Sequence, residues 1–277
     1  MPPSVAKARR ALGRGRRAAI QRFKASRDHS PRYAGNFRAT REEALAAGAG
    51  KSETGALFLS HEGRQIHKWT HYFDAYDREF APYRHGFPES DGSRRPLRFL
   101  EIGVAHGGSL QLWRRYFGPD AAIWGVDANP QCAAIDDSDL NVRIGSQADR
   151  RFLLGVVSEM GGVDIVLDDG SHRPEDQRKS FEVLFPLVSD GGLYAVEDLH
   201  ASYSQRFGGG YRRRGTFIEA AKAIIDDMHS WFHEQPAELL RSAESGASQL
   251  SVYNGIVFIH KSARQRPMVV KVGKTSF

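Results

Sequence analysis

Residues 163–172 read V-D-I-V-L-D-D-G-S-H, so that an apolar run ends abruptly in two carboxylates, a glycine, a hydroxyl and an imidazole. The pattern predicts a buried strand that presents polar chemistry at its carboxyl end. A second apolar run, at residues 192–197, ends in another acidic pair, Glu197 and Asp198. Because carboxylate oxygens suit hard cations, two neighbouring strand ends of this kind can hold such an ion.

Short apolar runs and helical patterns alternate on both sides of this stretch. The runs predict strands at residues 98–102, 122–127, 141–145, 163–168 and 192–197. Helices are expected at about residues 109–117, 149–160, 174–188 and 216–233. The strands are almost continuously apolar, which is typical of a parallel sheet covered on both faces.

The end of the chain predicts an antiparallel hairpin. Two β-type runs, at residues 250–253 and 256–260, are joined by Asn254 and Gly255, the strongest short hairpin signal. Five parallel strands plus a terminal hairpin favour the sheet of class I methyltransferases over that of dinucleotide-binding dehydrogenases. We therefore expect an α/β, Rossmann-like class I methyltransferase fold with a doubly wound, seven-stranded, mostly parallel sheet.

The chain before this sheet is expected to be organised separately. We assign residues 1–50 to a basic arm and linker, residues 51–96 to an N-terminal helical extension and residues 97–277 to the methyltransferase domain. Aromatic residues recur at steps of three and four from Trp69 to Tyr83, which predicts a helix that packs its rings into the core. His67 and His71 have the spacing of two metal ligands. No glutamate follows the first histidine, so packing or solvent-facing roles are favoured.

Positive charge is concentrated at the start of the chain. The 277 residues include 39 Lys and Arg against 33 Asp and Glu, a formal net charge of +6. Residues 1–27 hold nine Lys or Arg and no acid, which leaves 30 basic against 33 acidic residues. This near-neutral remainder argues against a nucleic-acid partner.

Hydropathy gives no sign of a membrane protein. No stretch approaches the roughly 20 apolar residues of a membrane span, and the amino terminus lacks the apolar core of a secretory signal. We therefore expect a cytoplasmic protein with no membrane partner. The one cysteine, Cys132, excludes an internal disulfide and is expected to be a small core residue.

The first predicted strand runs into a glycine-rich turn that reads L-E-I-G-V-A-H-G-G-S, at residues 100–109. Such a turn lets a ligand approach the backbone and the next helix, and we assign Gly103 and Ser109 to cofactor binding. The spacing differs from the G-x-G-x-x-G of dinucleotide sites, and Glu101 would repel a phosphate. An acid there suits S-adenosylmethionine, which carries an ammonium and a sulfonium.

Polar side chains also follow the next strands. Asp127 ends the second strand, where a carboxylate can accept hydrogen bonds from both ribose hydroxyls. Ser146, Gln147 and Asp149 follow the third strand, where the adenine of such a cofactor would lie. Asp149 has a rival role as the amino-terminal cap of its helix, and Asp168 is assigned to a supporting or cofactor-side role.

These motifs resemble a known family. The similarity lies in the runs L-E-I-G-V-A-H-G-G-S, G-V-D, G-S-Q-A-D, D-I-V-L-D-D-G-S-H and G-G-L-Y-A-V-E-D-L. They look like those of the metal-dependent sugar O-methyltransferases that act on macrolide antibiotics of the mycinamicin and macrocin type. The resemblance covers about residues 66–260. It implies that Asp169, Glu197 and Asp198 bind Mg²⁺ and that His172 is the general base.

Elementary chemistry agrees with this resemblance. A sugar hydroxyl is almost entirely un-ionised at neutral pH, so methyl transfer requires that it be polarised or deprotonated. A cation held by carboxylates acts as a Lewis acid, and His172, three residues beyond Asp169, can take the proton. The alternatives are that the acids cap the following helices and that His172 makes a structural hydrogen bond.

The acceptor is expected to be a small-molecule glycoside or saccharide. Residues 199–215 are rich in glycine and are expected to lie over the site, with Tyr203 and Arg206 meeting the acceptor. The resembled enzymes carry a larger N-terminal auxiliary domain that helps them assemble, so a homo-oligomer stays open. Other readings are a catechol-like phenol acceptor, RNA binding through the basic arm, and a non-catalytic cofactor-fold scaffold.

Overall fold

The computed structural model describes residues 38–136, 139–232, 246–263 and 266–276. The predicted basic arm at residues 1–27 lies outside these ranges. Arg41–Phe277 form one compact unit, which holds all the helices and strands of the described residues. Among the described helices, none combines the length and apolar character that crossing a membrane requires.

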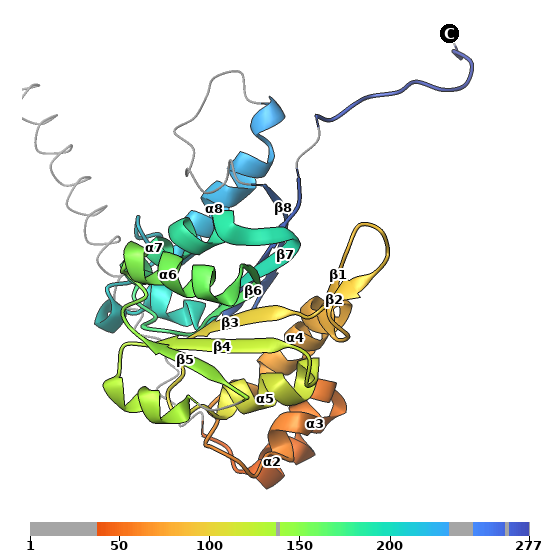
Figure 1. Ribbon diagram of the computed structural model, residues 1–277. Coiled ribbons are helices and arrows are strands. Elements are labelled where there is room, and N and C mark those ends of the chain that lie inside the picture. The colour runs from red at the N-terminus through yellow and green to blue at the C-terminus, as the bar shows by residue number, and fades with distance from the viewer. Residues whose placement is uncertain (1–37, 137–138, 233–245, 264–265, 277) are drawn as a thin grey trace, which may run out of the picture. The chain divides into compact units, whose positions relative to one another are not determined.

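A seven-stranded sheet forms the middle layer of this unit (Figure 1). Its strands are β3 (Arg98–Ile102), β4 (Ala122–Asp127), β5 (Asn141–Ile144), β6 (Val163–Asp168), β7 (Val188–Val196), β8 (Ala247–Tyr253) and β9 (Ile256–Lys261). The spatial order is β5-β4-β3-β6-β7-β9-β8. Strands β3 to β7 pair in parallel, whereas β9 pairs antiparallel with both β7 and β8, so the predicted doubly wound sheet and its terminal hairpin are confirmed.

The strand predictions differ from the structure mainly at β7. This strand begins at Val188, four residues before the apolar run at 192–197, because its pairing with β6 includes the Val163–Val188 pair before a register shift. A second, two-stranded sheet, β1 (Phe87–Pro88) with β2 (Arg94–Arg95), occupies a stretch rich in turn residues.

Helices cover both faces of the sheet (Figure 1). One face carries α2 (Arg41–Ala46), α3 (Glu53–Leu59), α4 (Phe73–Phe80) and α5 (Gly108–Phe117); the other carries α6 (Arg150–Met160), α7 (Pro174–Leu184) and α8 (Phe217–Met228). Helix α7 ends before residue 188 because Pro186, in the following 3-10 turn, has no amide hydrogen to continue the helix.

Short 3-10 helices complete the connections. They are η1 (Ala49–Lys51), η2 (Thr70–Tyr72), η3 (Ala81–Tyr83), η4 (Pro130–Ile135), η5 (Phe185–Leu187), η6 (Leu199–Tyr203), η7 (Gln205–Phe207) and η8 (Ser230–Phe232). Because α2 and the start of η1 lie before residue 51, the part of the predicted arm and linker, residues 1–50, that the structure describes is partly helical.

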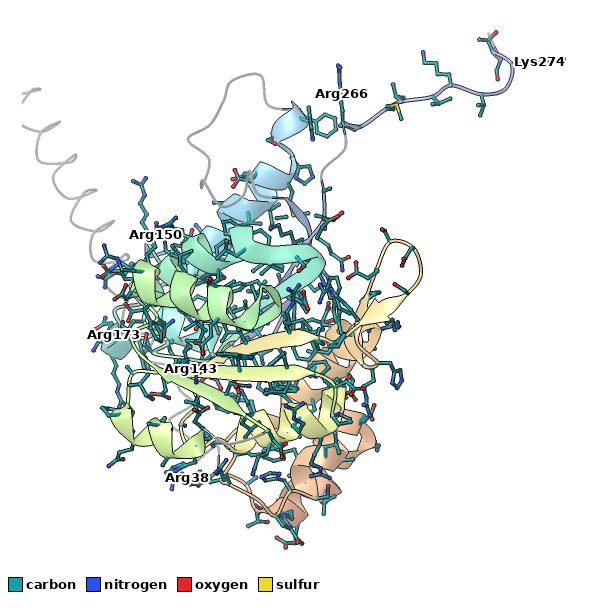
Figure 2. The ribbon with its side chains drawn as sticks, in the orientation of Figure 1. Arg38, Arg143, Arg150, Arg173, Arg266 and Lys274 are labelled. Atoms are coloured by element: carbon teal, nitrogen blue, oxygen red, sulfur yellow. The ribbon has the colours of Figure 1, made fainter. Side chains whose placement is uncertain are left out.

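Side chains fill the space between the sheet and each helical layer (Figure 2). The predicted aromatic stripe is confirmed as core, since Tyr72, Phe73, Tyr76 and Phe80 are almost fully buried. The rings of Tyr76 and Phe80 pack edge-on against Trp113 of α5, with centroids 5.1 and 5.4 Å away. These contacts fix α4 against α5, and the contacts of the Phe80 ring with Phe99 of β3 and Phe258 of β9 fix it against the sheet.

Two smaller predictions are also settled. Cys132 is buried, as expected of a core residue. His71 is exposed and hydrogen-bonds the carbonyl oxygen of Asn254 in the hairpin turn at 2.9 Å, so this histidine is solvent-facing, one of the two roles favoured for it.

The sheet places the predicted chemistry at one edge. Ile102 pairs with Asp168, and Asp168 pairs with Val196, so that the chain leaves β3, β6 and β7 at the same level. The direction in which successive strands are added to the sheet reverses between β3 and β6, which are neighbours in the sheet but are separated in the chain by β4 and β5. In open α/β sheets, ligands bind at the carboxyl ends of the strands beside such a reversal.

Candidate active site

A cavity of about 590 Å³ opens at the carboxyl ends of the strands. Its size is within the range of sites for small molecules and cofactors. The predicted residues that line it are Gly103, Ser109, Asp127, Ser146, Gln147, Asp169, His172, Glu197 and Asp198. Residues 65–69, which precede η2, form a further part of the wall.

Gly103 makes the sharp turn after β3. Its φ of 94° lies in the left-handed region, and a Cβ added there would stand 2.2 Å from the carbonyl oxygen of Asp169. Asp127 fixes the same turn from β4, because its Oδ2 accepts hydrogen bonds from the amides of Val104 and Ala105 at 2.9 and 3.0 Å. The glycine turn is therefore held in place by the acid that was predicted to meet a ribose.

Glu101 lies directly behind the cavity wall. Its side chain is fully buried, and the Ser109 hydroxyl donates to its Oε2 at 2.7 Å. Burial raises the pKa of Glu101 to about 7, against the opposing effect of the Lys68 ammonium. Ser109 thus reaches the cavity, while Glu101 acts through its neighbours.

Gln147 and Asp168 tie the loop after β5 to the loop after β6. The Gln147 amide donates to Asp168 at 3.2 Å, and its carbonyl oxygen accepts from the amide of Ser171 at 2.7 Å. Asp168 is fully buried and also accepts from the hydroxyls of Ser180 and Tyr194. Burial raises the pKa of Asp168 to about 6. Asp168 therefore has the supporting contacts that were expected of it.

Ser146 and Asp149 lie on either side of Gln147 and differ in their surroundings. Ser146 lines the cavity, and its hydroxyl oxygen accepts from the amide of Ala148 at 3.2 Å. Asp149 caps α6 by accepting from the amides of Arg151 and Phe152, and it lines a shallower hollow beside that helix. The rival capping role of Asp149 is thus the one seen in its contacts.

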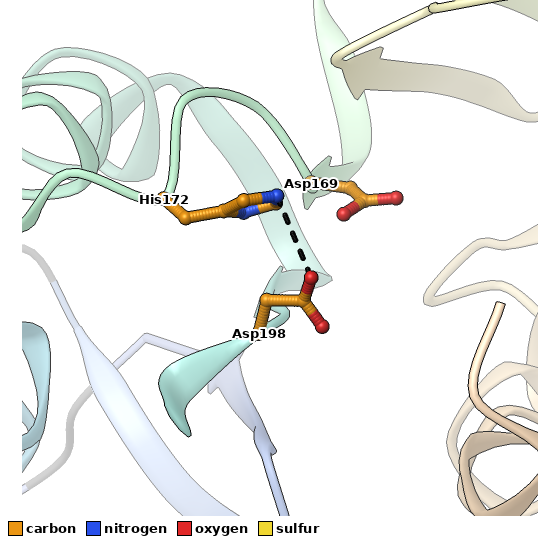
Figure 3. A group of neighbouring side chains, drawn as sticks. All are labelled: Asp169, His172 and Asp198. Atoms are coloured by element: carbon orange, nitrogen blue, oxygen red, sulfur yellow. Dashed lines mark ion pairs between the residues drawn. The ribbon is translucent and has the colours of Figure 1, made fainter. Parts of the chain in front are cut away.

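Asp169 and His172, in the loop after β6, come together with Asp198, in the loop after β7 (Figure 3). One ligand atom from each lies within 4.8 Å of the others, and His172 Nε2 is 3.4 Å from Asp198 Oδ2. His172 and Asp198 have φ values of 55° and 53°, the left-handed region that costs a non-glycine residue energy. This backbone conformation turns both side chains toward the same point.

Lys68 is part of the site and was not predicted. Its Nζ donates to Asp169 Oδ2 at 2.6 Å, to Glu197 Oε2 at 2.9 Å and to Glu101 Oε1 at 3.4 Å. The Lys68 side chain is only 2% exposed. Burial alone would lower the pKa of Lys68, but the carboxylates of Asp169, Glu197 and Glu101 outweigh it and raise that pKa well above its ordinary value.

Aromatic donors from the same segment hold the second acidic pair. Trp69 Nε1 and the Tyr72 hydroxyl both donate to Asp198 Oδ1 at 3.0 Å, and the Tyr76 hydroxyl donates to Glu197 Oε1. The helical period of the rings predicted only that they pack in the core. It carries no information on the reach of a phenol or indole to acids more than 120 residues later.

The two predicted acceptor contacts lie outside the cavity wall. Tyr203, at the end of η6, is 52% exposed, and Arg206 in η7 stacks over the ring of Phe207 at 5.6 Å. Two other residues of this segment contact the site: the Phe207 ring centroid is 6.1 Å from that of His172, and His200 Nδ1 is 3.8 Å from Asp198 Oδ1.

The donor set suits a hard cation. Glu101, Asp169 and Glu197 converge on one ammonium, and Asp198 adds a fourth carboxylate that faces His172. The Lys68 ammonium shows that the place already attracts positive charge, and the oxygens are the ligands that Mg²⁺ prefers. Asp169 and Asp198, together with His172, therefore fit a magnesium site, whereas the predicted ligand Glu197 already accepts hydrogen bonds at both oxygens, from Tyr76 and Lys68.

Comparison with known proteins gives several relatives, although no protein-family model matches the chain. The 8-demethyl-8-(2-methoxy-alpha-L-rhamnosyl)-tetracenomycin-C 3'-O-methyltransferase of Streptomyces olivaceus is 36% identical over 204 residues, 69% of this chain and 50% of the relative. The mycinamicin VI 2''-O-methyltransferase of Micromonospora griseorubida is 32% identical over 237 residues, 79% of this chain and 55% of the relative.

A solved structure has a similar level of sequence identity to this chain. The MycE methyltransferase of the mycinamycin biosynthetic pathway, in complex with Mg, SAH and mycinamycin VI, aligns with a TM-score of 0.62 at 32% identity. The alignment covers 76% of this chain and 53% of the solved chain. The chain thus spans about half the length of the relatives it matches.

Proposed function

Over the residues that it shares with these relatives, the chain belongs to the family of macrolide and tetracenomycin sugar O-methyltransferases, and we propose that it methylates a sugar hydroxyl. The methyl donor is S-adenosylmethionine, the metal is Mg²⁺ and the acceptor is a glycosylated natural product or a related saccharide. The observation that carries this proposal is the convergence of Asp169, His172 and Asp198 at the edge of the cavity.

The half of the cavity beside the glycine turn is proposed to hold the methyl donor. Gly103 lets it approach the backbone, and Ser109, Asp127, Ser146 and Gln147 offer polar atoms along the wall. The remaining predicted cofactor residues act from behind this wall: Glu101 through Ser109, Asp168 through Gln147, and Asp149 by fixing the start of α6.

Asp169, Glu197 and Asp198 are proposed to hold Mg²⁺. When bound, the ion acts as a Lewis acid that makes one sugar hydroxyl more acidic and orients the adjacent hydroxyl of the same sugar. Tyr76, Tyr72 and Trp69 keep two of these carboxylates in position through hydrogen bonds from the protein side.

His172 is proposed to take the proton from the acceptor hydroxyl. Its Nε2 faces the site, and the Asp198 carboxylate 3.4 Å away would stabilise the imidazolium that forms. Its Nδ1 is buried and makes no hydrogen bond to the residues that the structure describes. Nε2 is therefore the atom to which we assign the proton transfer.

The test measures S-adenosylhomocysteine formation with mycinamicin VI, demethylmacrocin and rhamnosyl-tetracenomycin C, the acceptors in the relatives' names. We expect chelation to abolish turnover and added Mg²⁺ to restore it. His172→Ala should lose about 10²- to 10⁴-fold in turnover, the usual contribution of a general base, while calorimetry shows unchanged cofactor affinity. Full turnover after chelation, or in Asp169→Asn, would contradict the metal mechanism, and absent cofactor binding would contradict methyl transfer.

A further inference from the structure

The Lys68 ammonium lies among the carboxylates that the proposed function assigns to Mg²⁺. It donates to Asp169 Oδ2 at 2.6 Å and to Glu197 Oε2 at 2.9 Å, two of the three proposed ligands. Lys68 is 2% exposed and Glu197 is 1% exposed, so water screens this contact poorly. A residue that already binds the metal's ligands must affect how the metal binds.

We propose that Lys68 is a resident cation of the acidic site that competes with a divalent ion for Asp169 and Glu197. This inference rests on the proposed metal-dependent function. A carboxylate oxygen that accepts a hydrogen bond from an ammonium cannot point the same lone pair at Mg²⁺, which needs oxygens at about 2.0–2.1 Å. Two cations held on the same buried carboxylates also repel each other.

The other carboxylates show why Lys68 can be displaced without emptying the site. Asp198 receives hydrogen bonds from neutral groups, the indole of Trp69 and the phenol of Tyr72, so a divalent ion can bind Asp198 without displacing the Lys68 ammonium from it. Glu101 contacts Lys68 more loosely, at 3.4 Å, and its second oxygen is held by Ser109. Asp169 and Glu197 are therefore the two carboxylates that the two cations would share.

The chain around Lys68 allows this exchange. Residues 65–69 lie between α3 and η2 and belong to no helix or strand. They line the cavity, so a displaced Lys68 side chain has a route into it. Moving this side chain breaks its ion pairs and leaves the backbone hydrogen bonds of the sheet intact.

The first experiment titrates Mn²⁺ into the metal-free protein and detects the free ion by electron paramagnetic resonance. We expect Lys68→Met to bind Mn²⁺ about tenfold or more tightly than the unmodified protein, because a repelling charge is removed. The matched control is Lys222→Met on α8, where an exposed lysine pairs with Glu219 at 2.6 Å. Its affinity should stay that of the unmodified protein. Equal or weaker binding by Lys68→Met would overturn the proposal.

A second measurement needs no variant and decides the matter if Lys68→Met fails to fold. Acylation of Lys68 by an N-hydroxysuccinimide ester is followed by mass spectrometry, with the Lys222 peptide as the internal standard. Mn²⁺ should increase labelling of Lys68 relative to Lys222, and unchanged labelling at saturating Mn²⁺ would overturn the proposal.

The two proposals fail in different ways. Binding of Mn²⁺ to the unmodified protein with no gain in Lys68→Met leaves the metal site standing and overturns the competition. Binding to Lys68→Met alone supports the competition and contradicts metal dependence in the unmodified protein. Binding to neither overturns both.

Discussion

Tyr76→Phe removes one hydroxyl and tests whether a hydrogen bond from α4 stabilises the buried Glu197 carboxylate of the site. The Tyr76 ring is fully buried between Phe80, Trp113 and Phe258, so phenylalanine keeps its packing. Its hydroxyl donates to Oε1 of Glu197, which is itself buried. The variant therefore deletes a donor to a buried carboxylate and little else.

The expected cost follows from the charge of the acceptor. A hydrogen bond to a charged group contributes about 1.5–3 kcal/mol, whereas a neutral one contributes about 1 kcal/mol. Tyr83 provides the matched control, because its side chain is also buried and its hydroxyl donates to the neutral carbonyl oxygen of Gly191 at 2.7 Å. We expect Tyr76→Phe to lower the free energy of unfolding by about 2 kcal/mol and Tyr83→Phe to lower it by about 1 kcal/mol.

The assay is urea unfolding of the metal-free and cofactor-free protein, with the free energy taken from the transition midpoint and slope. In the double variant Tyr76→Phe/Glu197→Gln, the free energy of unfolding should fall by less than the sum of its decreases in the two single variants, because both changes remove the same interaction. If Tyr76→Phe costs no more than Tyr83→Phe, Glu197 does not depend on this donor and the reasoning is refuted.

Two further predictions concern the other wall of the cavity. Gly103→Ala should destabilise the protein by several kcal/mol and abolish cofactor binding in calorimetry, because its Cβ would meet the Asp169 carbonyl at 2.2 Å and its φ is 94°. Gly155→Ala, in open space within α6, should instead stabilise by up to about 1 kcal/mol, and a similar loss in both variants would contradict the steric argument. Glu101 has its folded pKa raised from 4.5 to about 7, so its contribution to stability is present below pH 4.5 and is lost as pH rises to 7, by about 3 kcal/mol. Glu101→Gln should flatten that part of the pH profile of unfolding, and an unchanged profile would show that Glu101 does not titrate in this range.

The sequence predicts the sheet well because the physical signal is local. Strand β6 reads V-D-I-V-L-D, an apolar run interrupted by Asp164, which pairs with Arg95 and Arg98, and its ends agree with the prediction at both residues. Asn254 and Gly255 likewise form the turn between β8 and β9, in which Gly255 adopts the positive φ, 83°, that glycine tolerates best.

Other parts of the site could not be read from local patterns. Lys68 lies in a stretch without helical or strand periodicity, and its acidic partners follow 33, 101 and 129 residues later. Asp149 gave two readings because a helix cap and a ligand contact demand the same side chain, and only geometry separates them. Sequence thus identifies acids at strand ends but not the groups that hold them.

The long separation between the donors and acceptors of the site has a consequence for synthesis. During translation, Lys68 is made 129 residues before its partner Glu197, and Trp69 is made 129 residues before its partner Asp198. At roughly 5–20 residues per second, the ribosome needs about 6–26 s to supply these partners. During that interval Lys68 and Trp69 lack their acidic partners, although Phe99 and Trp113, which pack against α4, are already made. Lower growth temperatures and added chaperones should therefore raise the yield of active protein.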